Sequence, residues 1–231
     1  AALIYASSIS TSGTSHFAQP RSVRKDSELL AVSRRRSLDI DGEFHRALDT
    51  IRREWGNRTE HFQHQVYEME ADALLAEDGP LAESEVGVVY LDPPYTADNY
   101  SRFYHLLETL VNYDYPELQQ RKGTVTKGRY PVRERRYQSD FCKADKVEGA
   151  FRRIIEAVQK RGAALLVSYS ADSGLLLKHW KANGVKDPVT RFHGMFREFF
   201  PKVEIRERQL MHSGQGDSNR KVRELLVLCE N

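Results

Sequence analysis

The sequence has few cysteines and no long apolar run. Its 231 residues include only Cys142 and Cys229, which are too few for a disulfide framework and too far apart to form a zinc site by themselves. No apolar run approaches the roughly 20 residues that span a bilayer, and the first residues lack the basic start of a signal peptide. We therefore expect two free thiols, no membrane segment and a cytoplasmic location.

The sequence also lacks an excess of charge of one sign. Lys and Arg number 35, Asp and Glu number 33, and the net charge is +2. The charge is unevenly distributed, because residues 121–136 carry +6 and residues 21–36 carry +4, which leaves −8 for the rest. A near-neutral chain can therefore still present two basic segments to an anionic partner. The hydrophobic content of 40% argues against a disordered chain.

Alternating apolar strands and amphipathic helices favour an α/β fold. Residues 86–91, Val-Gly-Val-Val-Tyr-Leu, form the near-continuous apolar run of a strand buried on both faces, as in a parallel sheet. Other predicted strands are 61–70, 163–169, 202–211 and 222–230, and predicted helices are 41–55 with Asp41 as its cap, 100–111, 139–160 and 173–183. We predict an open, mostly parallel sheet with helices on both faces and a C-terminal antiparallel hairpin.

One short motif carries the chemistry. Asp92-Pro93-Pro94-Tyr95 follows the 86–91 strand, at the carboxyl end where open α/β sheets place their active sites. The two prolines remove two N–H donors, which leaves a carboxylate, carbonyls and one aromatic ring. Asp92 and the Pro93 carbonyl could accept the N–H bonds of an exocyclic amine on a planar base, and Tyr95 could stack on that base. Catalysis would then come from orientation and preorganised electrostatics. The structural alternative is a rigid turn between a strand and a helix.

With this motif the sequence resembles the N6-adenine-specific DNA methyltransferases, whose motif has the form (D/N/S)PP(Y/F/W). The segment from Tyr100 to Thr109, with Tyr-Ser-Arg-Phe-Tyr-His and Leu-Glu-Thr, is also similar to bacterial members. The resemblance extends from about residue 61 to 231. It implies a Rossmann-like methyltransferase fold, S-adenosylmethionine as the methyl donor, and DNA whose target adenine is flipped out. It makes Asp92, Pro93, Pro94 and Tyr95 the catalytic residues.

The resemblance also bears on the cofactor. It implies that Asp72 and Ala73 contact the adenine of S-adenosylmethionine, although Asp72 could equally cap a short helical segment. The family has a glycine-rich FxGxG turn, yet among 14 glycines the one Gly-x-Gly, at 214–216, lies in the expected hairpin connection. We therefore expect the chain to need a missing N-terminal segment or a second polypeptide to bind the cofactor and to be active. The start at Ala1, inside an apparent helix, favours truncation, and a catalytically dead remnant is the alternative.

The chain thus divides into an N-terminal arm or linker, 1–37, and a methyltransferase catalytic portion, 38–231, with a basic loop insertion at about 115–138. Lys and Arg in this insertion could neutralise DNA phosphates, although a solvated surface is the simpler explanation. The candidate DNA contacts are Tyr100, Arg102, Arg121, Lys122, Lys127, Arg129, Arg133, Arg135 and Arg136. We expect no metal site. An enzyme acting on an RNA base or a protein amide, and a non-catalytic DNA-binding or specificity module, remain as rivals to a DNA methyltransferase of a restriction-modification system.

Overall fold

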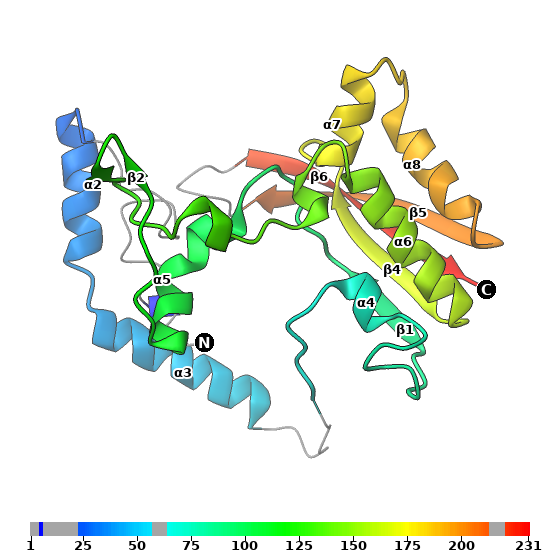
Figure 1. Ribbon diagram of the computed structural model, residues 1–231, viewed down its shortest axis with the longest axis horizontal. Helices are drawn as coiled ribbons and strands as arrows, with labels where there is room; N and C mark the ends of the chain where they lie inside the picture. The colour runs from blue at the N-terminus through cyan, green and yellow to red at the C-terminus, as the bar shows by residue number, and fades with distance from the viewer. Residues whose placement is uncertain (1–4, 7–22, 57–63, 213–219) are drawn as a thin grey trace. The chain divides into compact units, whose positions relative to one another are not determined.

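The computed structural model describes residues 5–6, 23–56, 64–212 and 220–231, which form two compact units (Figure 1). Unit 1 contains the described residues of 1–64 together with 99–138, and unit 2 contains the described residues of 65–98, 139–212 and 220–231. The two units alternate along the chain, so each is assembled from segments distant in sequence. None of the helices in the described ranges is long and apolar enough to cross a bilayer.

Unit 2 is built on a mixed four-stranded sheet. Its strands are β1 (Val88–Leu91), β4 (Ala164–Ser170), β5 (Lys202–His212) and β6 (Arg220–Glu230), in the order β1-β4-β6-β5. β1 runs parallel to β4, whereas β6 pairs antiparallel with both β4 and β5. The predicted C-terminal hairpin is confirmed. The prediction of a mostly parallel sheet is wrong for this unit, because the hairpin supplies two of its four strands.

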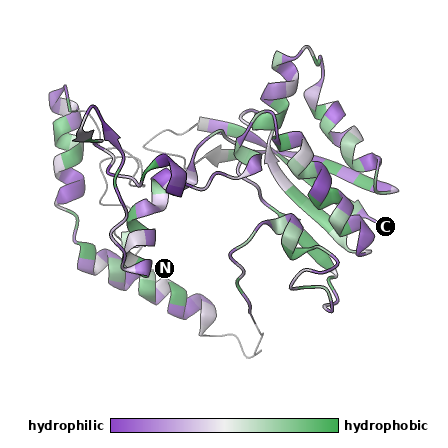
Figure 2. Ribbon diagram, viewed as in Figure 1, coloured by the Kyte–Doolittle hydropathy of each residue, from purple (hydrophilic) through white to green (hydrophobic). Residues whose placement is uncertain are grey.

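Three helices pack on one face of this sheet: α6 (Val147–Lys160), α7 (Leu175–Ala182) and α8 (Pro188–Arg197). The core is centred on three rings, since Phe151 of α6 lies edge-on to Tyr169 of β4 at 5.1 Å and to Phe192 of α8 at 5.4 Å. β4 is hydrophobic over most of its length (Figure 2). Each strand alternates between this core and the other face.

The other face of the sheet differs from the prediction. Tyr90 of β1 is 59% exposed and Leu226 of β6 is 39% exposed, although their neighbours Leu91 and Leu225 are buried. Within the described part of unit 2, helices therefore do not cover both faces. The expectation that residues 86–91 are buried on both faces is also wrong, because Val88 and Tyr90, which point to this other face, are exposed.

Several predicted elements have different bounds. Residues 64–70 form no strand, and Val66 in this segment is 96% exposed, so no sheet buries its apolar side chain. The expected helix 139–160 is divided: Ser139 caps a single 3₁₀ turn, η2 (Asp140–Cys142), and α6 begins only at Val147. A four-residue helix, α4 (Ala71–Leu74), precedes β1. α8 was not predicted, although Asp187 caps it by accepting a hydrogen bond from the Thr190 N–H at 3.0 Å.

Unit 1 is helical with one small hairpin. Its elements are α2 (Asp26–Arg36), α3 (Ile40–Trp55), α5 (Tyr100–Asn112), β2 (Gln120–Arg121), β3 (Thr124–Val125) and η1 (Arg133–Arg135). Within the expected N-terminal arm or linker, 1–37, residues 26–36 form the helix α2, which begins with a capping box in which Glu28 accepts from the Lys25 N–H. Asp39, not Asp41, caps α3 by accepting from the Gly42 N–H at 3.0 Å. The expectations for residues 1–4, 7–22, 57–63 and 213–219 lie outside the described residues.

Candidate active site

The Asp92–Tyr95 turn lies at the carboxyl end of β1, as the sequence predicts. β1 ends at the buried Leu91, and the prolines that follow cannot continue the strand ladder. The turn is fixed to the segment that follows β4, because the Tyr95 carbonyl accepts a hydrogen bond from the Leu175 N–H at 2.8 Å. Leu175 is the first residue of α7, so the motif is held between β1 and the start of that helix.

The loop beside the motif is closely packed around a glycine. Gly174 donates its N–H to the Ser170 carbonyl at 3.0 Å, directly after β4. A Cβ atom at this position would lie 2.4 Å from that carbonyl oxygen and 2.5 Å from Cε1 of Tyr169. Only glycine fits here without a shift of backbone or core. The close turn brings the start of α7 to the Tyr95 carbonyl.

The two expected acceptors differ in exposure. Asp92 is exposed, and Pro93 is buried. In the described ranges of the chain, no backbone N–H donates to the Pro93 carbonyl. Tyr95 is half-buried and packs against the core cluster. The turn therefore presents acceptors and one ring without competing donors.

The site contains a second carboxylate that no sequence pattern indicated. Glu224 of β6 is half-buried and accepts a hydrogen bond from the hydroxyl of Ser168 in β4. Partial burial, and after it the negative charge of Glu224, raises the pKa of the Asp92 carboxyl. The same two causes raise the pKa of Tyr95. Glu224 is 132 positions beyond Asp92 in the sequence, and only the strand order brings the two together.

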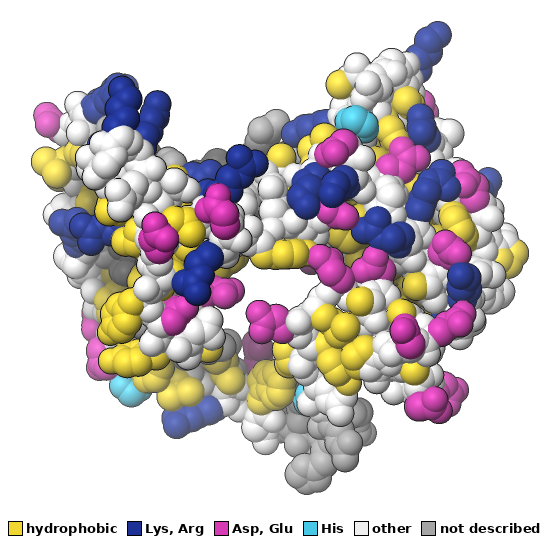
Figure 3. All heavy atoms as spheres, viewed as in Figure 1, with side chains coloured by type: hydrophobic (Ala, Val, Ile, Leu, Met, Phe, Trp, Pro, Cys, Tyr) yellow, Lys and Arg dark blue, Asp and Glu magenta, His cyan; other side chains and the backbone are white. Residues whose placement is uncertain are grey.

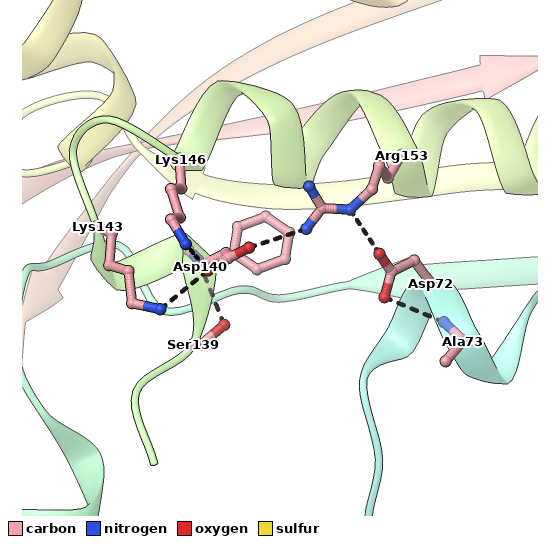
Figure 4. Close-up of polar contacts among 8 residues, drawn as sticks. Asp72, Ala73, Ser139, Asp140, Lys143, Lys146 and Arg153 are labelled. Carbon is pink, nitrogen blue, oxygen red and sulfur yellow. Dashed lines mark hydrogen bonds and ion pairs between the residues drawn. The ribbon is translucent and has the colours of Figure 1, made fainter. Parts of the chain in front are cut away.

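Asp72 takes part in an ion-pair network (Figure 4). Its Oδ2 accepts a hydrogen bond from Nε of Arg153 in α6 at 2.6 Å, and its Oδ1 accepts from the Ala73 N–H at 3.0 Å. Arg153 also donates to Asp140 at 3.2 Å. Asp72 lies in the first turn of α4, whose cap is Glu70. The predicted contact of Asp72 and Ala73 with a cofactor stays a prediction, and the Asp72 carboxylate already has two partners.

The described residues match the part of a methyltransferase site that binds the target amine. They match the part that binds the methyl donor less well. Asp72 is ion-paired, and the described ranges contain no glycine-rich turn after a strand. A cavity of about 870 Å³ in unit 2 adjoins Val86 and Gly87, and so lies at the amino end of β1, away from Asp92. That these residues need a further segment to hold S-adenosylmethionine stays a prediction.

The basic residues of the 115–138 segment lie in unit 1. Within the described ranges, no ion pair involves any of the predicted DNA contacts among them. The exposed members are Arg121, Lys122, Lys127, Arg129, Arg133 and Arg135. Over unit 2, by contrast, Lys and Arg side chains are interspersed with Asp and Glu (Figure 3). The segment thus carries positive charge without acidic partners among the described residues.

Two of the predicted DNA contacts also have a packing role. The guanidinium groups of Arg102 and Arg136 lie 4.7 Å and 5.1 Å from the ring centre of Tyr130. Arg102 belongs to α5 and Arg136 follows η1, so the ring joins the helix to the hairpin segment. Tyr100 is 41% exposed and stacks on Tyr104. DNA contact by these residues stays a prediction.

The structure places the Asp-Pro-Pro-Tyr turn at the carboxyl end of a β-strand, on a sheet of parallel and antiparallel strands. The family model for D12 class N6 adenine-specific DNA methyltransferases matches residues 43–161, which is just over half of the sequence. The chain belongs to this family. S-adenosylmethionine is the usual methyl donor of such methyltransferases.

Two curated proteins illustrate the relationship. The chain is 32% identical over 148 residues to the type II methyltransferase M.FokI of Planomicrobium okeanokoites, and the match covers 62% of this chain and 20% of that protein. It is 48% identical over 40 residues to the modification methylase LlaI of Lactococcus lactis subsp. lactis, covering 17% of this chain and 6% of that protein. The chain thus spans about a fifth of the length of the first relative. No solved structure matches the chain.

Proposed function

We propose that the chain is the catalytic portion of an adenine-specific DNA methyltransferase, which methylates the N6 amino group of an adenine flipped out of the duplex. The observation that carries this proposal is the Asp92–Tyr95 turn at the carboxyl end of β1, where the Asp92 carboxylate is exposed and no backbone N–H of the described ranges donates to the Pro93 carbonyl. The names of the two relatives support a role in restriction-modification.

The residues of the turn would act on the target amine. The Asp92 carboxylate and the Pro93 carbonyl accept its two N–H bonds, which favours a pyramidal nitrogen with a directed lone pair. Tyr95 stacks on the base and fixes its plane. When bound, S-adenosylmethionine would supply a methyl group attached to a positively charged sulfur. After methylation the nitrogen carries one proton too many, and Asp92 is the nearest group that can accept it.

Two partners complete the proposal. DNA is held by the exposed Lys and Arg side chains of the 121–136 segment, which have no acidic partners in the described ranges. The methyl donor is held partly by residues that the described chain lacks, so an N-terminal segment or a second polypeptide completes that site. The chain alone would then bind the donor weakly.

Transfer of a labelled methyl group tests the function. We expect transfer to duplex DNA by the chain once its donor site is complete, and a loss of about 100-fold or more in Asp92→Ala, because an acceptor for the amine is removed. Asp78→Ala is the matched control, since Asp78 is an exposed carboxylate on the loop before β1.

Three results would contradict the proposal in different ways. Transfer that survives Asp92→Ala would exclude the mechanism. Transfer to RNA alone would exclude DNA as the substrate. Tight DNA binding without transfer by the completed protein would favour a non-catalytic module.

A further inference from the structure

The register of the sheet brings three polar side chains onto one face, with Glu224 of β6 two residues from Leu226, the partner of Ser168. Leu91 of β1 pairs with Val167 of β4, so continuing the register sets Asp92 beside Ser168. Asp92 precedes a proline and is therefore extended, which continues the strand's alternation of faces. Asp92, Ser168 and Glu224 each adjoin a buried core residue, namely Leu91, Val167 and Leu225 respectively. All three therefore point to the face opposite α6, α7 and α8.

Ser168 serves to hold Glu224. It directly follows the apolar residues of β4, Ala164-Leu-Leu-Val, and it is only 6% exposed. A buried hydroxyl without a hydrogen-bond partner destabilises the fold, and the carboxylate of Glu224 accepts the hydrogen bond of this one. The hydrogen bond fixes the glutamate on the side of β6 that faces the Asp92 strand.

The negative charge of Glu224 is not neutralised by an ion pair within the described ranges. Arg208 of β5 is paired with Glu224 in the sheet register, yet it forms no ion pair with it. The adjacent Arg223 is bound to Asp172 and Glu207. The groups that face Asp92 are therefore Glu224, Ser168 and Tyr95. Two carboxylates near each other oppose folding, and such pairs are typical of catalytic sites.

We propose that Glu224 is a positioning residue of this active site: held by the Ser168 hydroxyl, it enables Asp92 to take the proton that leaves the methylated amine. This inference rests on the proposed function. The N–H bond of the methylated ammonium breaks, its electron pair stays on nitrogen, and the proton joins a carboxylate oxygen of Asp92. The negative charge of Glu224 favours the neutral form of Asp92, which then returns the proton to solvent.

The titration of Asp92 tests this inference without DNA or methyl donor. Carbon-13 NMR of the labelled carboxyl groups would follow Asp92 in the full chain. We expect its titration to move to lower pH in Glu224→Gln, because a neighbouring negative charge is removed. Ser168→Ala should move it in the same direction by a smaller amount. Glu204→Gln, a carboxylate on β5 that pairs with Arg206, is the control and should leave it unchanged.

The pH profile of methyl transfer supplies the second measurement. In Glu224→Gln we expect about a tenfold lower kcat and an acid limb of kcat/KM displaced to lower pH, with partial recovery in Glu224→Asp. A purely structural role would lower the rate at every pH and leave the limb in place.

The outcomes separate the two proposals. An unchanged titration of Asp92 in Glu224→Gln would overturn the role of Glu224. Transfer that survives Asp92→Ala, with a titration that still responds to Glu224→Gln, would overturn the proposed function and with it the proton step.

Discussion

The Asp92–Tyr95 turn depends on a residue without a side chain. Gly174 lets the chain turn directly after β4, and the turn places the Leu175 N–H against the Tyr95 carbonyl. The motif is therefore positioned by a close backbone approach on a neighbouring loop as well as by its own prolines. A substitution at Gly174 should displace the Asp92–Tyr95 turn, because it would shift the Leu175 N–H that donates to the Tyr95 carbonyl.

We expect Gly174→Ala to destabilise unit 2 by about 1–3 kcal/mol, because the new Cβ would meet the Ser170 carbonyl and the Tyr169 ring. Gly194→Ala in α8 is the matched control. Nothing lies within 4 Å of a Cβ at Gly194, so alanine there should stabilise the helix by about 0.5–1 kcal/mol. Urea unfolding of both variants measures the difference. Equal stability of the two would contradict the close packing at Gly174.

Residues of the site differ in how far the sequence reveals them. Asp92–Tyr95 could be predicted, because the four residues are contiguous and their chemistry is set by two prolines. Glu224 could not, because its place beside Asp92 follows from β6 inserting between β4 and β5. The ion pair between Asp72 and Arg153 could not be predicted either, since the two residues are 81 positions apart.

Among the elements, α6 links several separate segments of unit 2. Its apolar face fills the core beside β4, and its exposed Arg153 reaches Asp72 before β1 and Asp140 in η2. Asp140 is also bound by Lys143 at 3.0 Å. The hydrogen bond from Lys143, aided by Lys146 and Arg153, lowers the pKa of Asp140.

A lowered pKa stabilises the fold at neutral pH, and this stability is lost as pH falls through the pKa of the folded state. We expect Asp140→Asn to lower the free energy of unfolding at pH 7 by roughly 1 kcal/mol or less. The difference from the unmodified chain should shrink as pH falls below the usual range of aspartate. Urea unfolding at pH 7 and at acid pH measures it.

Asp145→Asn, which removes an exposed carboxylate from the same connection, is the control and should change little at either pH. A deficit in Asp140→Asn that stays constant with pH would show that the ion pairs of Asp140 do not stabilise the fold.

Elements with a regular apolar period could be predicted, and the others could not. The apolar positions of α6 recur every three or four residues, and β4 begins with the apolar run Ala164-Leu-Leu-Val. Residues 61–70 alternate as a strand would, yet residues 64–70 have no partner strand to bury Val66. α8 is short and begins at an Asp-Pro pair, which is equally typical of a turn.

In the molecule as a whole, the basic segment and the candidate active site belong to different units. The basic 121–136 segment belongs to unit 1, whereas Asp92, Ser168 and Glu224 belong to unit 2. The net charge of +2 conceals this division. DNA binding and methyl transfer should therefore be separable by mutation.

We expect the joint replacement of Arg121, Lys122, Lys127 and Arg129 by Gln to weaken binding to duplex DNA. The slope of log K against log salt should fall by about 0.9 for each phosphate that the variant no longer neutralises. Fluorescence anisotropy of a labelled duplex at several salt concentrations measures both quantities. The control replaces four exposed cations of unit 2, Lys178, Lys181, Lys186 and Arg197, and removes the same charge. Equal weakening in both variants would indicate a general charge effect instead of a DNA-binding segment.

The alternation of the two units along the chain governs the order of folding during synthesis. β1 leaves the ribosome 76 residues before Ala164, the partner of its first residue Val88, and β6 follows later still. The hairpin segment of unit 1 lies within that interval and is closed by hydrogen bonds between residues close in sequence. Contacts distant in sequence form slowly because loop closure must come first. The Asp92–Tyr95 turn therefore waits, with the edge of β1 unpaired, until β4 and Leu175 have been made.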